Sequence, residues 1–322
     1  MKKIKIFSMI LLVGLCYVVS SCNYDEAPLT ASGIKSGYTV PQGNHDYDSE
    51  IVDFYSRYGS CLLYKFTDKD TYWTPSGWKN GVLGLPAQGA ATGYIVTAAD
   101  EQYVGKQLDL LNKLWFGFYS DAFLKKFLPV KVMLCSKVQS CVWGTTPQGF
   151  GVVGTDKPAY YNYDNICVSY GSSSVNNLTL SDSLTIAQSI NRCFMESMLG
   201  RSLSVPTNEF VSAASYTSLS TLTTNKACWA RGIFPPSYSA TPLADWKNFL
   251  FMMVSYPESY LTRVPKTTIT DSNFTETAWE GILNPAKDTN GLLIKRYTMV
   301  RNYFINNYGM DLQIIGNYNK NY

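Results

Sequence analysis

The sequence predicts an α+β fold for this chain of 322 residues. Segments with helical periodicity and segments with the composition of strands follow each other irregularly, without the regular strand–helix alternation of a doubly wound sheet. Hydrophobic residues make up 46% of the chain, enough to build one large globular domain or two smaller ones. Since neither an internal repeat nor a second linker interrupts the later part of the chain, we expect a single domain over residues 45–322.

Apolar residues at steps of three and four predict helices over 50–58, 97–118, 181–200 and 292–308. Runs of β-branched and aromatic residues predict strands over 61–66, 130–135, 149–153 and 166–170. Pro129 ends a further short helix, Ser181 or Asp182 can cap the helix over 181–200, and Gly309 can cap the last helix.

The helix over 181–200 carries a glutamate beside its apolar surface. Met195 and Leu199 are four residues apart and share one face. The neighbouring face is a stripe of Ala187, Ile190, Phe194 and Met198. The helix is therefore apolar over more than half of its circumference and should be largely buried, so the carboxylate of Glu196 requires an explanation.

Charge and histidine content exclude several kinds of function. The net charge is +3 and no dense basic patch is present, so we expect no nucleic acid partner. His45 is the single histidine, which rules out a zinc site of two or three imidazoles within the chain. A Ser-His-Asp or Cys-His apparatus would have to use His45, whose position at the end of a tether favours a solvent-exposed side chain.

The N-terminus has the pattern of a bacterial lipoprotein signal. A basic start is followed by an apolar run over 6–19, shorter than the roughly 20 residues of a membrane span. The run ends in Val19-Ser20-Ser21-Cys22, which resembles a lipobox. We therefore expect residues 1–21 to be removed, Cys22 to carry fatty acids such as palmitate, and 22–44 to form a flexible tether rich in Pro, Gly, Ser and Thr.

The residues after the lipid cysteine suggest a location. Asn23-Tyr24-Asp25-Glu26 resembles the acidic surface-export signal of Bacteroidetes lipoproteins, although an ordinary solvated linker would look similar. The resemblance implies an outer-membrane protein, lipid-anchored and exposed at the cell surface.

Six cysteines remain after Cys16 and Cys22 are set aside: Cys61, Cys135, Cys141, Cys167, Cys193 and Cys228. None forms a C-x-x-C pair, so a thiolate zinc site or a redox motif is not expected. Several lie in apolar runs and are predicted to be buried free thiols.

The order of segments resembles a family, the zinc-binding metallopeptidase-like lipoproteins of Bacteroidetes, over nearly the whole mature chain. The stretches that carry the resemblance are DYDSEIVDFYSRYGSCLLYKF, LKKFLPVKVMLCSKV, VPTNEFVSAASYTSL, ARGIFPPSYSATPLADWKNFLFMMVSYP and IKRYTMVRNYFINNYGMDLQII. The resemblance implies a zincin-like metallopeptidase fold. It also implies zinc as the family's cofactor and a genomic setting beside glycan-uptake systems.

The family's zinc motif, H-E-x-x-H, is degraded in this sequence. The best register places Met195 and Leu199 at the two histidine positions and Glu196 at the general base. A register four residues earlier places Asn191 and Arg192 in the motif and restores no imidazole.

The acidic E-D-x-x-E cluster of the family's later helix corresponds to Ala244-Asp245-Trp246-Lys247-Asn248, where Asp245 alone persists. A thioether, a hydrocarbon and scattered carboxylates do not form a zinc site, so no cofactor is predicted.

These residues predict a catalytically inactive protein that binds a peptide or glycan polymer or assists an uptake complex. The alternatives are a metal-dependent peptidase with an atypical site and a purely structural lipoprotein. Glu196 is either the remnant of a general base in a cleft or a surface charge. Buried near Asp245, it should pair with a cation such as Arg192 or have a raised pKa.

Overall fold

The computed structural model describes residues 37–71, 93–147, 149–266 and 279–319. A compact unit begins at Val40 and contains every helix and strand given below. The predicted signal peptide, the predicted lipidation site Cys22 and most of the predicted tether lie outside the described residues. Within these ranges, no helix has both the length and the apolar character needed to cross a membrane.

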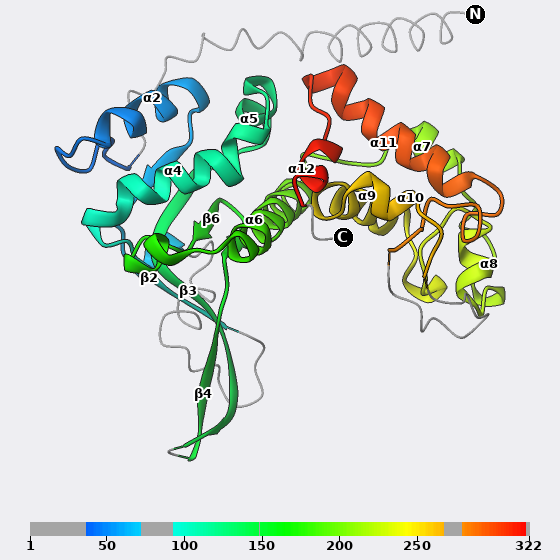
Figure 1. Ribbon diagram of the computed structural model, residues 1–322, viewed down its shortest axis with the longest axis horizontal. Coiled ribbons are helices and arrows are strands. Elements are labelled where there is room, and N and C mark those ends of the chain that lie inside the picture. The colour runs from blue at the N-terminus through cyan, green and yellow to red at the C-terminus, as the bar shows by residue number, and fades with distance from the viewer. Residues whose placement is uncertain (1–36, 72–92, 148, 267–278, 320–322) are drawn as a thin grey trace, which may run out of the picture. The chain divides into compact units, whose positions relative to one another are not determined.

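Helices and strands are mixed as the α+β prediction requires (Figure 1). The strands are β1 (Cys61–Leu63), β2 (Gly93–Ala98), β3 (Lys131–Thr146), β4 (Gly149–Asp156), β5 (Ala159–Asn162) and β6 (Asn165–Val168). The helices of the first half are α2 (Asp48–Tyr58), α4 (Val104–Leu114) and α5 (Asp121–Phe127). The later helices are α6 (Leu180–Gly200), α7 (Asn208–Ser212), α8 (Asn225–Trp229), α9 (Pro242–Ser255), α10 (Glu258–Thr262), α11 (Leu292–Tyr308) and α12 (Gln313–Tyr318).

The long strand β3 organises a mixed sheet of six described strands. Its first residues lie between β1 and β6, both parallel to it, with Met133 paired to Leu63 on one side and Cys167 on the other. Its later residues pair with β2 and β4, both antiparallel. Strand β5 runs antiparallel to β6 and occupies the other end of the β1-β3-β6-β5 order.

Helix α6 packs on β5 and β6 and also contacts α4, α9 and α12. Its start is fixed by a capping box, in which the Thr179 hydroxyl accepts from the Asp182 amide at 3.1 Å and the Asp182 carboxylate accepts from the Thr179 amide at 2.9 Å. The N-cap is therefore Thr179, and the expectation of Ser181 or Asp182 was wrong by two or three residues because Asp182 supplies the reciprocal bond.

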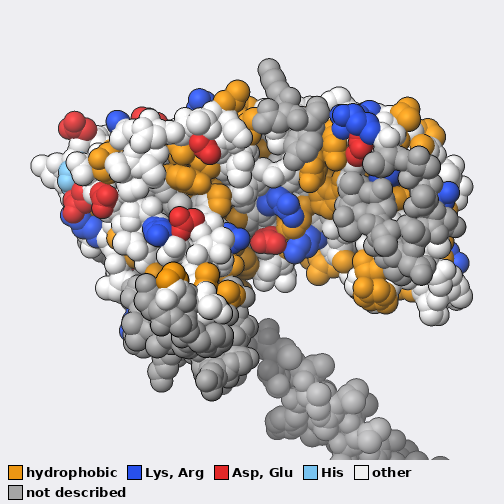
Figure 2. Space-filling model, turned by 60° about the horizontal axis from the view of Figure 1, so that its bottom comes forward, with side chains coloured by type: hydrophobic (Ala, Val, Ile, Leu, Met, Phe, Trp, Pro, Cys, Tyr) orange, Lys and Arg blue, Asp and Glu red, His pale blue; other side chains and the backbone are white. Residues whose placement is uncertain are grey.

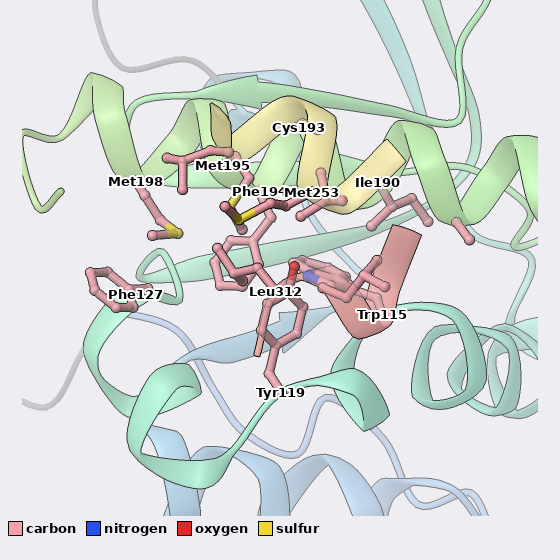
Figure 3. Packing of buried hydrophobic residues seen from close by; sticks show 14 of the residues in the cluster. Trp115, Tyr119, Phe127, Ile190, Cys193, Phe194, Met195, Met198, Met253 and Leu312 are labelled. Atoms are coloured by element: carbon pink, nitrogen blue, oxygen red, sulfur yellow. The ribbon is translucent and has the colours of Figure 1, made fainter. Parts of the chain in front are cut away.

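The apolar stripe of α6 faces an aromatic cluster, as Figure 3 shows. The Phe194 ring meets Trp115 and Tyr119 edge to face, with centroids 5.4 and 5.1 Å apart. Met195 and Met198 are fully buried beside it. The predicted burial of this helix is therefore confirmed. Burial of such side chains contributes about 1.5–3 kcal/mol each to stability.

Several boundaries differ from the sequence predictions. Residues 93–98 form β2, and the helix within 97–118 begins at Val104, because the strand pairs with β3 as far as Ala98. Strand β3 continues to Thr146, well beyond the predicted end at residue 135. The last helix and its cap are confirmed, since α11 spans Leu292–Tyr308 and Gly309 has a φ of 61°.

All six cysteines in the described ranges are buried and free, which confirms the prediction of buried thiols. On the face shown in Figure 2, acidic and basic side chains are interspersed among neutral and hydrophobic ones.

Candidate binding groove

A groove of about 510 Å³ lies between α6 and α9. Helix α6 contributes Glu196, Leu199 and Gly200, and α9 contributes Leu243, Ala244 and Lys247. Tyr161 of β5 and Thr241 complete the lining. Three positions singled out by the degraded motifs therefore meet in one groove: the general-base position, the second histidine position and the first residue of the acidic cluster.

Glu196 is an exposed residue of this groove. Its carboxylate lies 3.4 Å from the Lys247 ammonium, and the two side chains are 46% and 44% exposed. An exposed pair of this kind contributes about 0–1 kcal/mol to stability. Arg192, the expected partner of Glu196, instead lies over the Phe251 ring at 4.7 Å, and Lys247 lies over the same ring at 4.9 Å.

The two positions that match the motif histidines differ in their surroundings. Met195 is 0% exposed and belongs to the hydrophobic core, as its place among the residues of Figure 3 shows. Leu199 is half-buried and lines the groove. The thioether and the isobutyl group therefore serve packing, one inside the core and one at its edge.

Asp245 lies in a separate, buried environment. Its side chain is 1% exposed and accepts from Arg296 at 2.8 Å, from the Tyr216 hydroxyl at 2.6 Å and from the Phe234 amide at 3.0 Å. Burial raises the pKa of Asp245 above its usual value, while its contacts with Arg296, Tyr216 and the Phe234 amide act in the opposite direction. Asp245 therefore does not join Glu196 in one site.

Arg296 completes this buried group. Its guanidinium is 0% exposed, lies 3.8 Å from the Phe210 ring centroid and donates to the Gly232 carbonyl. The group links α9, α11 and the segment that leads into α9, so its role is structural.

The groove residues do not fit zinc. Zinc requires nitrogen, thiolate or carboxylate donors converging on one point. The motif positions offer a buried thioether, a hydrocarbon and one carboxylate beside an ammonium group that repels cations. Nor does any set of three or more His, Cys, Asp or Glu side chains in the described ranges have the arrangement of a metal site.

Asn191 of the alternative register is also engaged in packing rather than in a site. It is fully buried, donates to the Leu114 and Ala187 carbonyls at 2.9 and 2.7 Å, and accepts from Tyr119 at 2.8 Å. Neither register of the motif therefore presents metal ligands.

Tyr161 packs directly on the last residue of α6. A Cβ at Gly200 would lie 2.4 Å from the Tyr161 hydroxyl and 2.8 Å from its ring, so the ring rests where any larger residue would put a side chain. Burial raises the pKa of Tyr161 above its usual value, and nearby Arg201 opposes this. The tyrosine thus forms a fixed aromatic wall of the groove.

Sequence reasoning missed Tyr161, Leu243 and Lys247 as groove residues. Lys247 lay within the quoted acidic-cluster match, but its pairing with Glu196 depends on the contact between α6 and α9. Leu243 is 48% exposed, an apolar side chain on the first turn of a capped helix. Such exposure becomes visible only when the fold is known.

His45, the single histidine, lies away from this groove. Its Nδ1 is 3.1 Å from Asp48 and its Nε2 is 3.2 Å from Glu101, and its ring stacks on Tyr47 at 4.8 Å. The imidazole is part of the surface of the unit's N-terminal region and takes no part in the groove.

Comparisons with known proteins show a distant structural similarity. Neither a protein-family model nor a curated protein matches this chain. A crystal structure of a candidate zinc-binding metallopeptidase from Bacteroides caccae ATCC 43185 aligns with 84% of this chain and 89% of its own. Identity is 12% and the TM-score is 0.43. A similarity this distant identifies no functional residue.

Proposed function

We propose that this protein is a lipid-anchored outer-membrane protein of the cell surface, related to metallopeptidases in fold but without zinc or peptidase activity. It acts as a binding or accessory protein for a peptide or glycan polymer, beside a glycan-uptake system. Its groove between α6 and α9 is the surface on which such a ligand binds.

The proposed absence of catalysis depends on one observation: the positions that match the motif histidines hold apolar side chains that pack against the protein. Met195 is fully buried, Leu199 has no donor atom, and Glu196 faces an ammonium group at 3.4 Å. A general base must polarise a bound water, and a metal must sit beside it to lower the pKa of that water. Nothing at positions 195 and 199 can hold that metal.

Binding is supported by the groove itself. Its volume of about 510 Å³ is within the range of ligand sites, and its lining combines apolar side chains with one charge pair and one tyrosine. The weak Glu196–Lys247 pair can exchange its partner for polar groups of a ligand, because little stability is lost when it opens.

The experiment that tests inactivity compares the full chain with a Glu196→Ala variant. Each is incubated with zinc chloride and dialysed, bound zinc is measured by mass spectrometry, and cleavage of casein and of a peptide library is followed with and without a chelator. We expect far less than one zinc per chain and equal background cleavage for both proteins. One tightly bound zinc, or chelator-sensitive cleavage lost in the variant, establishes the atypical peptidase instead.

The lipid anchor has its own test. Cells grown with labelled palmitate should incorporate the label into the wild-type chain and not into a Cys22→Ala variant, because the lipid is attached to the protein through that cysteine. Protease added to intact cells should degrade the protein if it is exposed at the surface. A labelled Cys22→Ala variant, or full protection from protease, contradicts the corresponding part of the proposal.

A further inference from the structure

A second groove, of about 560 Å³, lies between α7 and α11. It shares no lining residue with the groove between α6 and α9. Its size is within the range of about 300–1,000 Å³ that is typical of small-molecule sites. Its walls combine polar side chains, Glu209 from α7 and Lys295, Thr298, Asn302 and Asn306 from α11, with the apolar surfaces of Met299 and Tyr303.

The spacing of the α11 residues explains why they line one surface. Steps of three and four place Lys295, Thr298, Asn302 and Asn306 along one side of the helix. The core side of the same helix carries Leu293, Tyr297, Val300 and Phe304, all buried. The groove-lining residues are thus a continuous polar stripe walled by the start of α7.

Apart from the Thr298 hydroxyl, which donates to the Ile294 carbonyl at 2.9 Å, the polar side chains of this stripe have no protein partner among the described residues. The side chains of Glu209, Lys295, Asn302 and Asn306 make no hydrogen bond or ion pair with any described residue. Each asparagine amide offers two donors and one acceptor. By contrast, the amide of the next residue, Asn307, donates to the Tyr303 carbonyl at 2.8 Å and does not line the groove.

An aromatic ring lies among these polar groups. Tyr303 is half-buried, and its ring is held against Trp246 with centroids 5.6 Å apart and against Phe304 at 5.0 Å. A supported ring beside free amides suits a ligand with hydroxyl groups on its edge and C–H groups on its faces.

The charges that line the groove restrict the chemical class of its ligand further. Glu209 and Lys295 are of opposite sign, so the groove has no net field for a polyanion or a polycation. Its polar walls are equally unsuited to a wholly apolar ligand, because the amides would lose water without gaining partners.

We propose that the groove between α7 and α11 binds a neutral saccharide, with the amides of Asn302 and Asn306 bonding its hydroxyls and Tyr303 packing on its ring face. This site is independent of the function proposed above for the other groove, and it does not require that the protein lacks zinc.

The test uses the purified full chain in detergent and a panel of neutral oligosaccharides of differing linkage, namely gluco-, manno- and xylo-oligosaccharides, with oligogalacturonate as the charged comparison. Binding is measured by titration calorimetry. Two variants are compared with the wild type: Asn302→Ala/Asn306→Ala, and the matched control Asn307→Ala. Circular dichroism confirms that both fold.

We expect at least one neutral oligosaccharide to bind. The double variant should lower its affinity about tenfold or more, and Asn307→Ala should leave it unchanged. The proposal is overturned if no neutral oligosaccharide binds, or if the double variant binds as well as the wild type.

Discussion

Helix α9 carries two charged residues only two positions apart, and their ion pairs differ in exposure to solvent. Asp245 pairs with Arg296 in the interior, where both side chains are at most 1% exposed. Lys247 pairs with Glu196 at the groove, where both are about half exposed to solvent. The comparison teaches that the acidic residue Asp245, which the resemblance in sequence singled out, has a structural role, whereas the groove pair is weak and replaceable.

The largest effect is expected from breaking the buried pair. Arg296→Ala should lower the free energy of unfolding by about 3–5 kcal/mol, because it leaves the Asp245 carboxylate buried without its cation. Urea denaturation measures the loss. A double variant, Asp245→Leu with Arg296→Met, should recover much of the stability, and an equally unstable double variant would contradict this account of the pair.

The two motif positions should differ next. Met195→Ala should cost about 2–4 kcal/mol because it opens a cavity in the core. Leu199→Ala should cost about 1 kcal/mol, since that side chain is half-buried and the groove is open to water. Equal losses in urea denaturation would mean that Met195 is not a core residue in solution.

A pH-dependent effect is expected at the capping box that begins α6. Hydrogen bonds from the Thr179 hydroxyl and amide lower the pKa of Asp182. A lowered folded-state pKa adds stability above the ordinary carboxyl range and loses it as the pH falls through the lowered value. Asp182→Asn should therefore lower the urea midpoint at pH 7, and the difference should begin to shrink as the pH falls below about 4 and continue to shrink as it passes through the lowered pKa. A difference that stays the same from pH 7 down to pH 2.5 would show that the capping box does not act through the ionised carboxylate.

The smallest effect is expected from the groove pair. Glu196→Gln and Lys247→Met should each change the free energy of unfolding by less than about 1 kcal/mol. A loss of several kcal/mol, measured as for the buried pair, would remove the distinction between the two.

Much of the fold could be predicted where the signal is local. The bounds of α11 follow from its apolar spacing and from Gly309, and the burial of α6 follows from the width of its apolar surface. Strand β2 could not be predicted in this way, because pairing with β3 decides that residues up to Ala98 are extended. The same ladder, together with β4, extends β3 from Cys135 to Thr146.

The site shows the same division. Glu196, Met195 and Leu199 could be singled out from the motif register. The sequence could not predict that Met195 is buried while Glu196 and Leu199 line the groove, because this depends on how α6 packs on the core and on α9. Tyr161 reaches Gly200 from a different strand. Contacts between segments far apart in the chain decide both points, and no periodicity in a single segment reports them.

The six buried cysteines have a practical consequence. Each thiol can react with a labelling reagent only when the structure around it opens, and together they sample β1, β3, β6, α6 and α8. The rate at which each cysteine becomes labelled under native conditions would thus report the free energy of local opening around it, one region of the molecule at a time.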